Sequence, residues 1–393
     1  MHRLSCFVLA AACCAPGACL EAAASPATTY QVTILSSANS QGNSVNDFGL
    51  VSGGYTLANN ALHASLWIYG RQVDLGTLGS GAGLSSRVQW PVKNLLGLIS
   101  GISLTDQLDP NKEGWSCGFF LSNPNFNVCR GFVWDRFGGM RALPTLGGTN
   151  GFATGTNDLA QTVGWAENTV RDPTCISPQV LQFQPVLWGP GRDEIHALPM
   201  PDGDTNGAAT AINDRGQIVG ISGSCGFAVG GPTGKHAVLW ENGNPTVLVN
   251  PNGAPFWNTP MMINEHGAVV GFAGVPGDAA GAFTPPFMWT RDRGWMFLPL
   301  LPGEISGVAT SINESGQVVG YSNDAGGNFH PWIYENGTLT NFNSLIAPGS
   351  GLTGPVMLLF DINDEGVITG STTTGQAIVA KPVRTDGADS RGE

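Results

Sequence analysis

The chain has 393 residues and a formal net charge of −12, with only 17 Lys and Arg residues, which argues against nucleic acid or an anionic membrane as a partner. Only 12% of the residues are charged and 56 are glycine, about twice the usual share of glycine. This composition favours tight turns over long helices, and the length suits one large all-β domain.

Residues 1–24 are typical of a secretory signal peptide. A short basic start leads into an apolar run, and three alanines then offer a cleavage site before Ser25. We therefore expect a secreted protein, extracellular or periplasmic, with no membrane span in the mature chain. Cleavage at Cys13 to give a lipoprotein is a less favoured alternative, because Ala10 stands where such signals usually carry leucine.

A ten-residue motif recurs through the rest of the chain. Its clearest copy, residues 211–220, has an Asn at the third position, a Gly three residues later and an apolar run closed by a second Gly. Asn and Gly suit the tight turn of a β-hairpin, so we interpret the Asn as turn chemistry rather than catalysis. The copies recur about every fifty residues, a period typical of propellers. The seven Asn residues are Asn46, Asn94, Asn157, Asn213, Asn264, Asn313 and Asn363.

Each repeat unit offers four strands, which in the fourth unit span 208–212, 217–222, 236–240 and 245–249. Four hairpin-linked strands in about fifty residues form one propeller blade. The third strand carries a tryptophan in five units, which we interpret as a wedge between neighbouring blades rather than a carbohydrate platform. These tryptophans are Trp67, Trp134, Trp188, Trp240 and Trp289.

The two ends of the chain complete each other. Residues 30–35 form a fourth strand without a unit of its own, and the last unit holds only three strands. Pairing them closes a ring of seven blades and removes the open sheet edges that favour aggregation. We therefore predict a single seven-bladed β-propeller of four-stranded blades over residues 25–383, followed by a flexible tail at 384–393. Six blades plus a non-propeller cap is the alternative, because the second unit matches the pattern poorly.

These repeats resemble the bacterial extracellular HAF-repeat family, whose units carry a His-Ala-Phe stretch before Leu-Trp and an Asp-Leu-Gly-x-Leu-Gly segment. The match is close at residues 63–79, 208–222, 236–240 and 309–322 and loose at 86–131. The resemblance implies a secreted or surface-exposed bacterial repeat protein, and it implies no particular biochemical activity.

The mature chain retains four cysteines. An even number in a secreted chain indicates disulfides, with three possible pairings, and a metal site is the weaker interpretation because no Cys-x-x-Cys pair occurs. Cys117 and Cys129 share one insertion and should bond to each other. Cys175 and Cys225 lie in equivalent loops of adjacent blades and should bond across them.

The strand order divides the loops between two faces of the ring. The Asn turns lie on one, here called the hairpin face. The crossovers between blades, the loops between second and third strands and every long insertion lie on the other, the loop face. Variable loops on a rigid frame often bind ligands. On the loop face we expect Trp90, Trp115 and Trp257 to stack on a sugar or peptide or, alternatively, to cap the apolar channel end.

Acidic residues follow six of the seven motif asparagines. They lie on the hairpin face and repeat too regularly to be catalytic candidates. They are Asp47, Asp158, Asp214, Glu265, Glu314 and Asp364.

One crossover on the loop face begins like a calcium loop. Asp202, Asp204 and Asn206 alternate and are closed by a Gly, as calcium ligands often are. The twelfth position of such a loop, however, falls on Asn213 instead of a glutamate. Calcium is therefore a minor possibility, and no other cofactor is expected.

These features favour a monomeric binding or scaffold module whose loop face recognises an extracellular glycan or protein. No residue is assigned a catalytic role, because no familiar catalytic motif occurs. The alternative is a hydrolase or lyase acting on extracellular polysaccharide at the mouth of the central channel. Its chemistry would need two carboxylates to converge on the loop face. The candidates there are Asp202, Asp204, Asp278 and Glu304.

Overall fold

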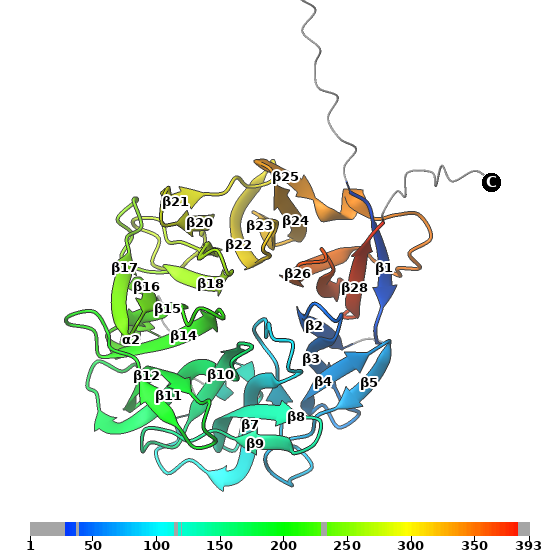
Figure 1. Ribbon diagram of the computed structural model, residues 1–393. Coiled ribbons are helices and arrows are strands. Elements are labelled where there is room, and N and C mark those ends of the chain that lie inside the picture. The colour runs from blue at the N-terminus through cyan, green and yellow to red at the C-terminus, as the bar shows by residue number, and fades with distance from the viewer. Residues whose placement is uncertain (1–27, 37–38, 114–116, 119, 229–233, 384–393) are drawn as a thin grey trace, which may run out of the picture.

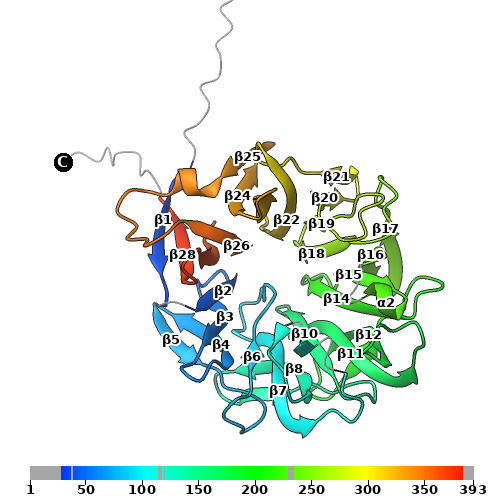
Figure 2. The ribbon, with the colours of Figure 1, turned by 180° about the vertical axis from the view of Figure 1, so that it is seen from behind.

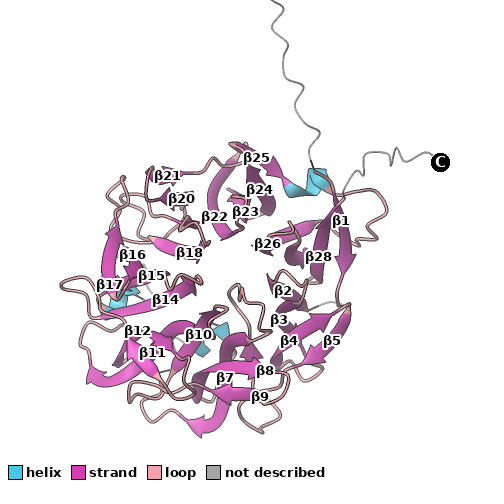
Figure 3. Cartoon of the chain, viewed as in Figure 1, coloured by secondary structure: helices cyan, strands magenta, loops and turns pink. Residues whose placement is uncertain are grey.

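The computed structural model describes residues 28–36, 39–113, 117–118, 120–228 and 234–383. Seven four-stranded antiparallel sheets form a ring in which each sheet is one blade (Figure 1). Strands dominate, and helix is confined to short turns such as α2 (Cys225–Ala228) and η1 (Phe342–Leu345) (Figure 3). The predicted signal peptide and C-terminal tail lie outside the described residues, as does Trp115.

In six blades the strands run outward from the central axis in chain order (Figure 1). The first two blades are β2 (Ser40–Val45), β3 (Val51–Thr56), β4 (Leu62–Ile68), β5 (Arg71–Asp74), and β6 (Ser86–Arg87), β7 (Ile99–Leu108), β8 (Asn127–Asp135), β9 (Gly139–Ala142). The third and fourth are β10 (Gly151–Thr156), β11 (Thr162–Arg171), β12 (Leu181–Trp188), β13 (Ile195–Ala197), and β14 (Asn206–Ile212), β15 (Ile218–Gly223), β16 (His236–Glu241), β17 (Asn244–Leu248). The fifth and sixth are β18 (Thr259–Ile263), β19 (Val269–Phe272), β20 (Pro286–Thr290), β21 (Gly294–Phe297), and β22 (Glu304–Ile312), β23 (Val318–Asp324), β24 (Phe329–Glu335), β25 (Thr338–Asn341).

The seventh blade joins the two ends of the chain. Its inner strands are β26 (Val356–Ile362), β27 (Ile368–Thr372) and β28 (Ala377–Pro382), and its outer strand is β1 (Tyr30–Ile34). β1 pairs antiparallel with β28, so that the blue and red ends of the chain meet in Figures 1 and 2. The predicted closure and the count of seven blades are confirmed, and the six-bladed alternative is wrong.

The second blade departs from the others at its inner strand. Ser86, opposite Ser103, lies eight residues before Asn94, whereas its equivalent Gly207, opposite Ser222, lies six before the next motif Asn. The two extra residues fall in a stretch containing Trp90, and only Ser86 and Arg87 keep strand pairing. This insertion explains why the unit matches the repeat poorly in sequence and still forms a complete blade.

The recurring tryptophans pack between blades, as expected for wedges. Trp67 and Trp240 are only 1% exposed. The indole of Trp188 donates to the carbonyl oxygen of Pro144 at 2.8 Å, and that of Trp240 donates to Pro199 at 2.5 Å. Each acceptor belongs to the preceding blade, so the same side chain fills the apolar gap and links two sheets. Trp134 and Trp289 remain partly exposed.

Both predicted disulfides are present. Cys117 bonds Cys129, with 5.8 Å between their Cα atoms, and Cys175 bonds Cys225, with 4.5 Å between theirs. The first holds an insertion within the second blade, and the second joins loops of the third and fourth blades. Such bonds are typical of proteins in oxidising compartments. Within the described residues, no helix is both long and apolar enough to cross a membrane.

Candidate functional site

The seven motif asparagines link every blade to the next. Within each turn the side-chain oxygen accepts main-chain amides, as the Asn213 oxygen does from the amide of Gln217 at 2.9 Å. The side-chain nitrogen donates to a carbonyl of the following blade, so the bonds run all the way around the ring. The donor–acceptor pairs are Asn46–Asn94, Asn94–Thr156, Asn157–Asn213, Asn213–Asn264, Asn264–Asn313, Asn313–Asn363 and Asn363–Asn46, at 2.9 to 3.3 Å.

The acidic residues after these asparagines form a second, outer layer of bonds on the hairpin face. Each carboxylate accepts the main-chain amide of the residue at the equivalent position in the preceding blade, as Glu265 does from Asp214 at 2.7 Å. The circle is open at the second blade, where Leu95 replaces the acid. Burial, followed by repulsion from neighbouring carboxylates, raises the pKa of Asp214 and Glu265. The other accepting carboxylates are Asp47, Asp158, Glu314 and Asp364.

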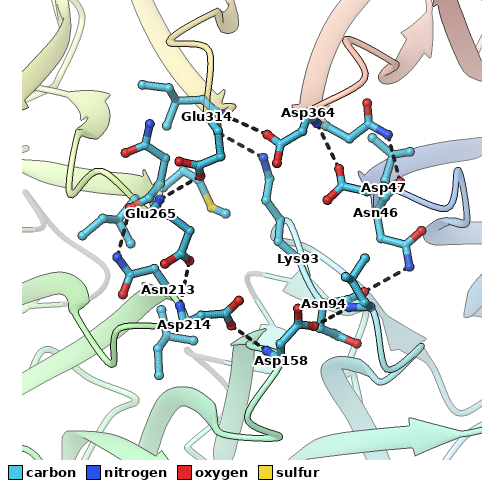
Figure 4. A pocket seen from close by; sticks show the side chains of 18 residues that line it. Asn46, Asp47, Lys93, Asn94, Asp158, Asn213, Asp214, Glu265, Glu314 and Asp364 are labelled. Carbon is cyan, nitrogen blue, oxygen red and sulfur yellow. Dashed lines mark hydrogen bonds between the residues drawn. The ribbon is translucent and has the colours of Figure 1, made fainter.

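A single lysine crosses the mouth that these layers surround (Figure 4). Lys93 extends from the second blade through a cavity of about 100 Å³. Its ammonium donates to the carbonyl oxygens of Ile312 at 3.0 Å and Ile362 at 2.6 Å, and it lies 3.4 Å from a carboxylate oxygen of Asp361. The ammonium therefore contacts the sixth blade through Ile312 and the seventh blade through Ile362 and Asp361. Lys93 acts as a strut across the ring.

Asp361, the partner of this strut, is fully buried. It also accepts from the amide of Val45 at 2.8 Å and the hydroxyl of Ser311 at 2.6 Å. Burial raises its pKa, and Lys93 opposes that rise. On the hairpin face these side chains therefore hold neighbouring blades together.

On the loop face, the tryptophans proposed as a ligand platform lie apart. Trp90 packs edge-on against Phe120 and Phe152, with ring centroids 5.4 and 5.5 Å away, on the cluster that includes the Cys117–Cys129 disulfide. Trp257 precedes the fifth blade, and its indole donates to the carbonyl oxygen of Ala279 at 3.2 Å. Trp90 and Trp257 thus have separate partners among the described residues, and both the stacking role and the capping role stay predictions.

Two of the three residues proposed for calcium, Asp204 and Asn206, form other hydrogen bonds. Asp204 binds His236 and the hydroxyl of Ser222, both at 2.6 Å, through one carboxylate oxygen. The side-chain oxygen of Asn206 accepts the amide of Phe183 at 2.8 Å, and Asp202 is exposed. Across the described ranges, no three His, Cys, Asp or Glu side chains are grouped closely enough to hold a metal ion. Calcium binding stays a prediction.

Three of the loop-face carboxylates that the enzyme alternative would need form their bonds in separate blades. Glu304 binds His330 of the sixth blade at 2.6 Å, while Asp204 binds a histidine of the fourth. Asp278 accepts the amide of Phe283 at 2.8 Å. Each of these three carboxylates is engaged within its own loop or blade.

A pocket of about 310 Å³ opens on the loop face between the seventh and first blades. Among the described residues that line it, Arg87 alone is charged; it reaches in from the second blade and donates to the Gln41 side-chain oxygen at 2.5 Å. Burial lowers the pKa of Arg87 to about 10, so the guanidinium is still charged at neutral pH. The remaining walls are rich in hydroxyl groups, from Ser40, Thr56, Ser371, Thr372 and Thr373.

Two departures from the repeat create this pocket. The residue after the motif's second Gly is large in five blades, where it is Ile102, Trp165, Ile221, Phe272 or Tyr321. In the two blades that border the pocket it is Gly54 or Ser371. A side chain added at Gly54 would approach the Arg87 side chain at 3.8 Å. An alignment of the seven repeats shows the small residue at this position, but the position was not among the sites predicted from the sequence.

Known proteins add information on the fold only. No protein-family model matches the chain, and no curated protein matches it. Among solved structures, a streptogramin B lyase shares 12% identity at a TM-score of 0.50, with 90% of this chain and 98% of that chain covered. An oligogalacturonate lyase in complex with manganese shares 11% identity at a TM-score of 0.53, with 91% and 95% covered. At these identities the likeness supports the propeller fold and nothing finer.

Proposed function

We propose that this protein is a secreted, non-catalytic binding module that recognises an extracellular ligand through its loop face. One observation carries the proposal, namely that the pocket holds the half-buried Arg87 guanidinium and that none of the described residues lining it offers a carboxylate. Charges withdrawn from water in folded proteins are normally paired. We infer that a ligand supplies the ion that pairs with this guanidinium.

The two faces differ in how their polar groups are used. On the hairpin face the motif amides, the carboxylates after them and the Lys93 ammonium all bond to neighbouring blades. On the loop face the disulfides fix long insertions of the second, third and fourth blades, and a separate pocket of about 310 Å³ opens between the seventh and first blades. Small-molecule sites are typically pockets of about 300–1,000 Å³ with a few fixed polar groups. The disulfides also support the proposed secretion.

The test is retention of the purified protein on a panel of immobilised polysaccharides and peptides, compared between two matched variants. Thr373→Glu places a carboxylate at the exposed rim of the loop-face pocket, where it repels an anionic ligand. Ser315→Glu places the same side chain on an exposed turn of the hairpin face, where the seventh blade already has Glu365. We expect a retained ligand that Thr373→Glu releases and Ser315→Glu does not. Retention lost only in Ser315→Glu, or absent throughout the panel, refutes the proposal.

A further inference from the structure

We propose that the pocket formed around Gly54, Arg87 and Ser371 binds a hexuronic acid unit, with the sugar carboxylate on the Arg87 guanidinium and the ring hydroxyls on the surrounding Ser and Thr side chains. This inference rests on the proposed function and names the ligand class of the same pocket.

The guanidinium determines the charge of the ligand. Arginine has five N–H donors in a planar fork that matches a carboxylate, and the one hydrogen bond found for Arg87 uses a single nitrogen, on the Gln41 oxygen at 2.5 Å. Within the part of the chain that the structure describes, no acidic side chain lines the pocket. A carboxylate can therefore approach the remaining donors without meeting a like charge.

The other residues that line the pocket indicate that the ligand carrying this carboxylate is a polyol. Residues with hydroxyl groups line the wall contributed by the seventh blade, where Thr373 is exposed. A hydroxyl both donates and accepts hydrogen bonds, as the hydroxyls of a sugar do. The side chains of Leu62 and Met357 add apolar contacts such as the C–H face of a sugar ring makes.

The volume of the pocket and the net charge of the protein further restrict the class of ligand. At about 310 Å³ the pocket is at the low end of the range for small-molecule sites, which suits one sugar unit rather than a chain of several. The protein carries a net charge of −12, so non-specific attraction does not draw a polyanion to it. Any preference for an acidic sugar must arise locally at Arg87.

The experiment measures binding of sodium glucuronate, sodium galacturonate, glucose and glucuronate methyl ester to the full mature chain by ligand-detected NMR and calorimetry. The ester keeps the shape of the acid and removes its charge. We expect at least one free acid to bind at least tenfold more tightly than glucose and than the ester, a difference of about 1.4 kcal/mol. Oligomers of the preferred acid, tested in parallel, show whether the protein binds a single uronic acid or a uronic acid unit within a polymer.

Three variants locate the binding. Arg87→Gln should weaken binding of the acid at least tenfold, while Arg215→Gln, the same change on the hairpin face, should leave it unaltered. Gly54→Ile fills the pocket with the residue type found in the second and fourth blades and should abolish binding with the charge retained. Thermal unfolding of each variant identifies any loss caused by misfolding. If Arg87→Gln does not fold, Gly54→Ile and the acid-to-ester ratio of the unaltered protein still decide the question.

Several outcomes overturn the inference, and they can be told apart from failure of the proposed function. Equal binding of acid and ester, no binding of either acid, or unaltered affinity in a folded Arg87→Gln or Gly54→Ile protein each refutes a uronate site. If a panel ligand is retained and released by Thr373→Glu in the same preparation, the loop-face function stands without the uronate site. If nothing is retained, both proposals fail.

Discussion

The strut across the hairpin-face mouth makes a quantitative prediction. Replacing Lys93 with methionine removes the charge and retains a long side chain in the cavity. The variant leaves Asp361 fully buried with no opposite charge beside it, since its other hydrogen bonds among the described residues come from the amides of Val45 and Ile362 and the hydroxyl of Ser311. We expect Lys93→Met to lower the free energy of unfolding.

The magnitude follows from the burial of the two partners. Removing one member of a buried ion pair typically costs about 3–5 kcal/mol. The Lys93 side chain is 24% exposed whereas that of Asp361 is 0% exposed, so water can take over some of the lysine's bonds but does not reach the carboxylate. We therefore expect a loss near the low end, about 3 kcal/mol at pH 8.

A double-mutant cycle separates loss of the pair from loss of packing. The first and sixth blades have serine at the position of Asp361, as Ser44 and Ser311. Lys93→Met combined with Asp361→Ser contains neither charge, and we expect its free energy of unfolding to fall within about 1 kcal/mol of the parent protein. Urea unfolding followed by tryptophan fluorescence provides the measurement for all four proteins.

The pH dependence gives a second, independent test. Burial raises the pKa of Asp361 above its unfolded value near 4, and Lys93 opposes the rise, so Lys93→Met should raise it further. A raised carboxyl pKa means that the folded protein binds the proton more tightly, and stability is lost as pH rises through that interval. The deficit of Lys93→Met should therefore shrink as pH falls from 8 towards 4. A deficit that is independent of pH, or equal in the double variant, would refute the account.

Three further predictions concern the ring and its insertions. Replacing Cys175 and Cys225 with serine opens a 50-residue loop, and chain entropy gives an expected loss of about 4 kcal/mol, measurable by calorimetry and contradicted by unchanged melting. Asn213→Ala removes the turn bond and the bond to the fifth blade, so we expect a loss of about 1–3 kcal/mol in urea unfolding; a loss below the measurement error would show that the ring bond is dispensable. Burial, then repulsion from Glu113, raises the pKa of Glu167 to about 7, so stability should fall as pH rises from about 4.3 to 7. Glu167→Gln should flatten that slope in unfolding curves taken at several pH values, and an unaltered slope would contradict the assignment.

The features that the sequence predicted are those that repeat. Blade number and strand order follow from the spacing of the motif, and closure by β1 follows from the missing fourth strand of the last unit. The disulfide pairing also followed, because equivalent loops of adjacent blades must lie side by side. A periodic sequence allows these predictions because each repeat unit contacts only its neighbours.

The features that the sequence did not predict are departures from the repeat. Lys93 and Asp361 meet across the channel although 268 residues separate them, and neither is unusual until the other's position is known. The motif asparagines were correctly interpreted as turn residues, but their bonds to the next blade required the geometry of the ring. Trp90 could be either a cap or a platform from sequence alone, because local pattern does not reveal what covers an aromatic ring.

Departures from a repeat also distinguish the two ends of the channel. On the hairpin face a lysine at a position that is uncharged in the other six blades is matched by an aspartate at a second such position, so the two charges compensate within the chain. On the loop face Gly54 and Ser371 open space around Arg87, and no carboxylate of the described pocket lining compensates its charge. A charge paired by the fold stabilises the fold, whereas a charge given room and left unpaired by its pocket is placed to meet a ligand. The uronate test addresses this asymmetry, because it asks whether the missing partner of Arg87 is a carboxylate from outside the chain.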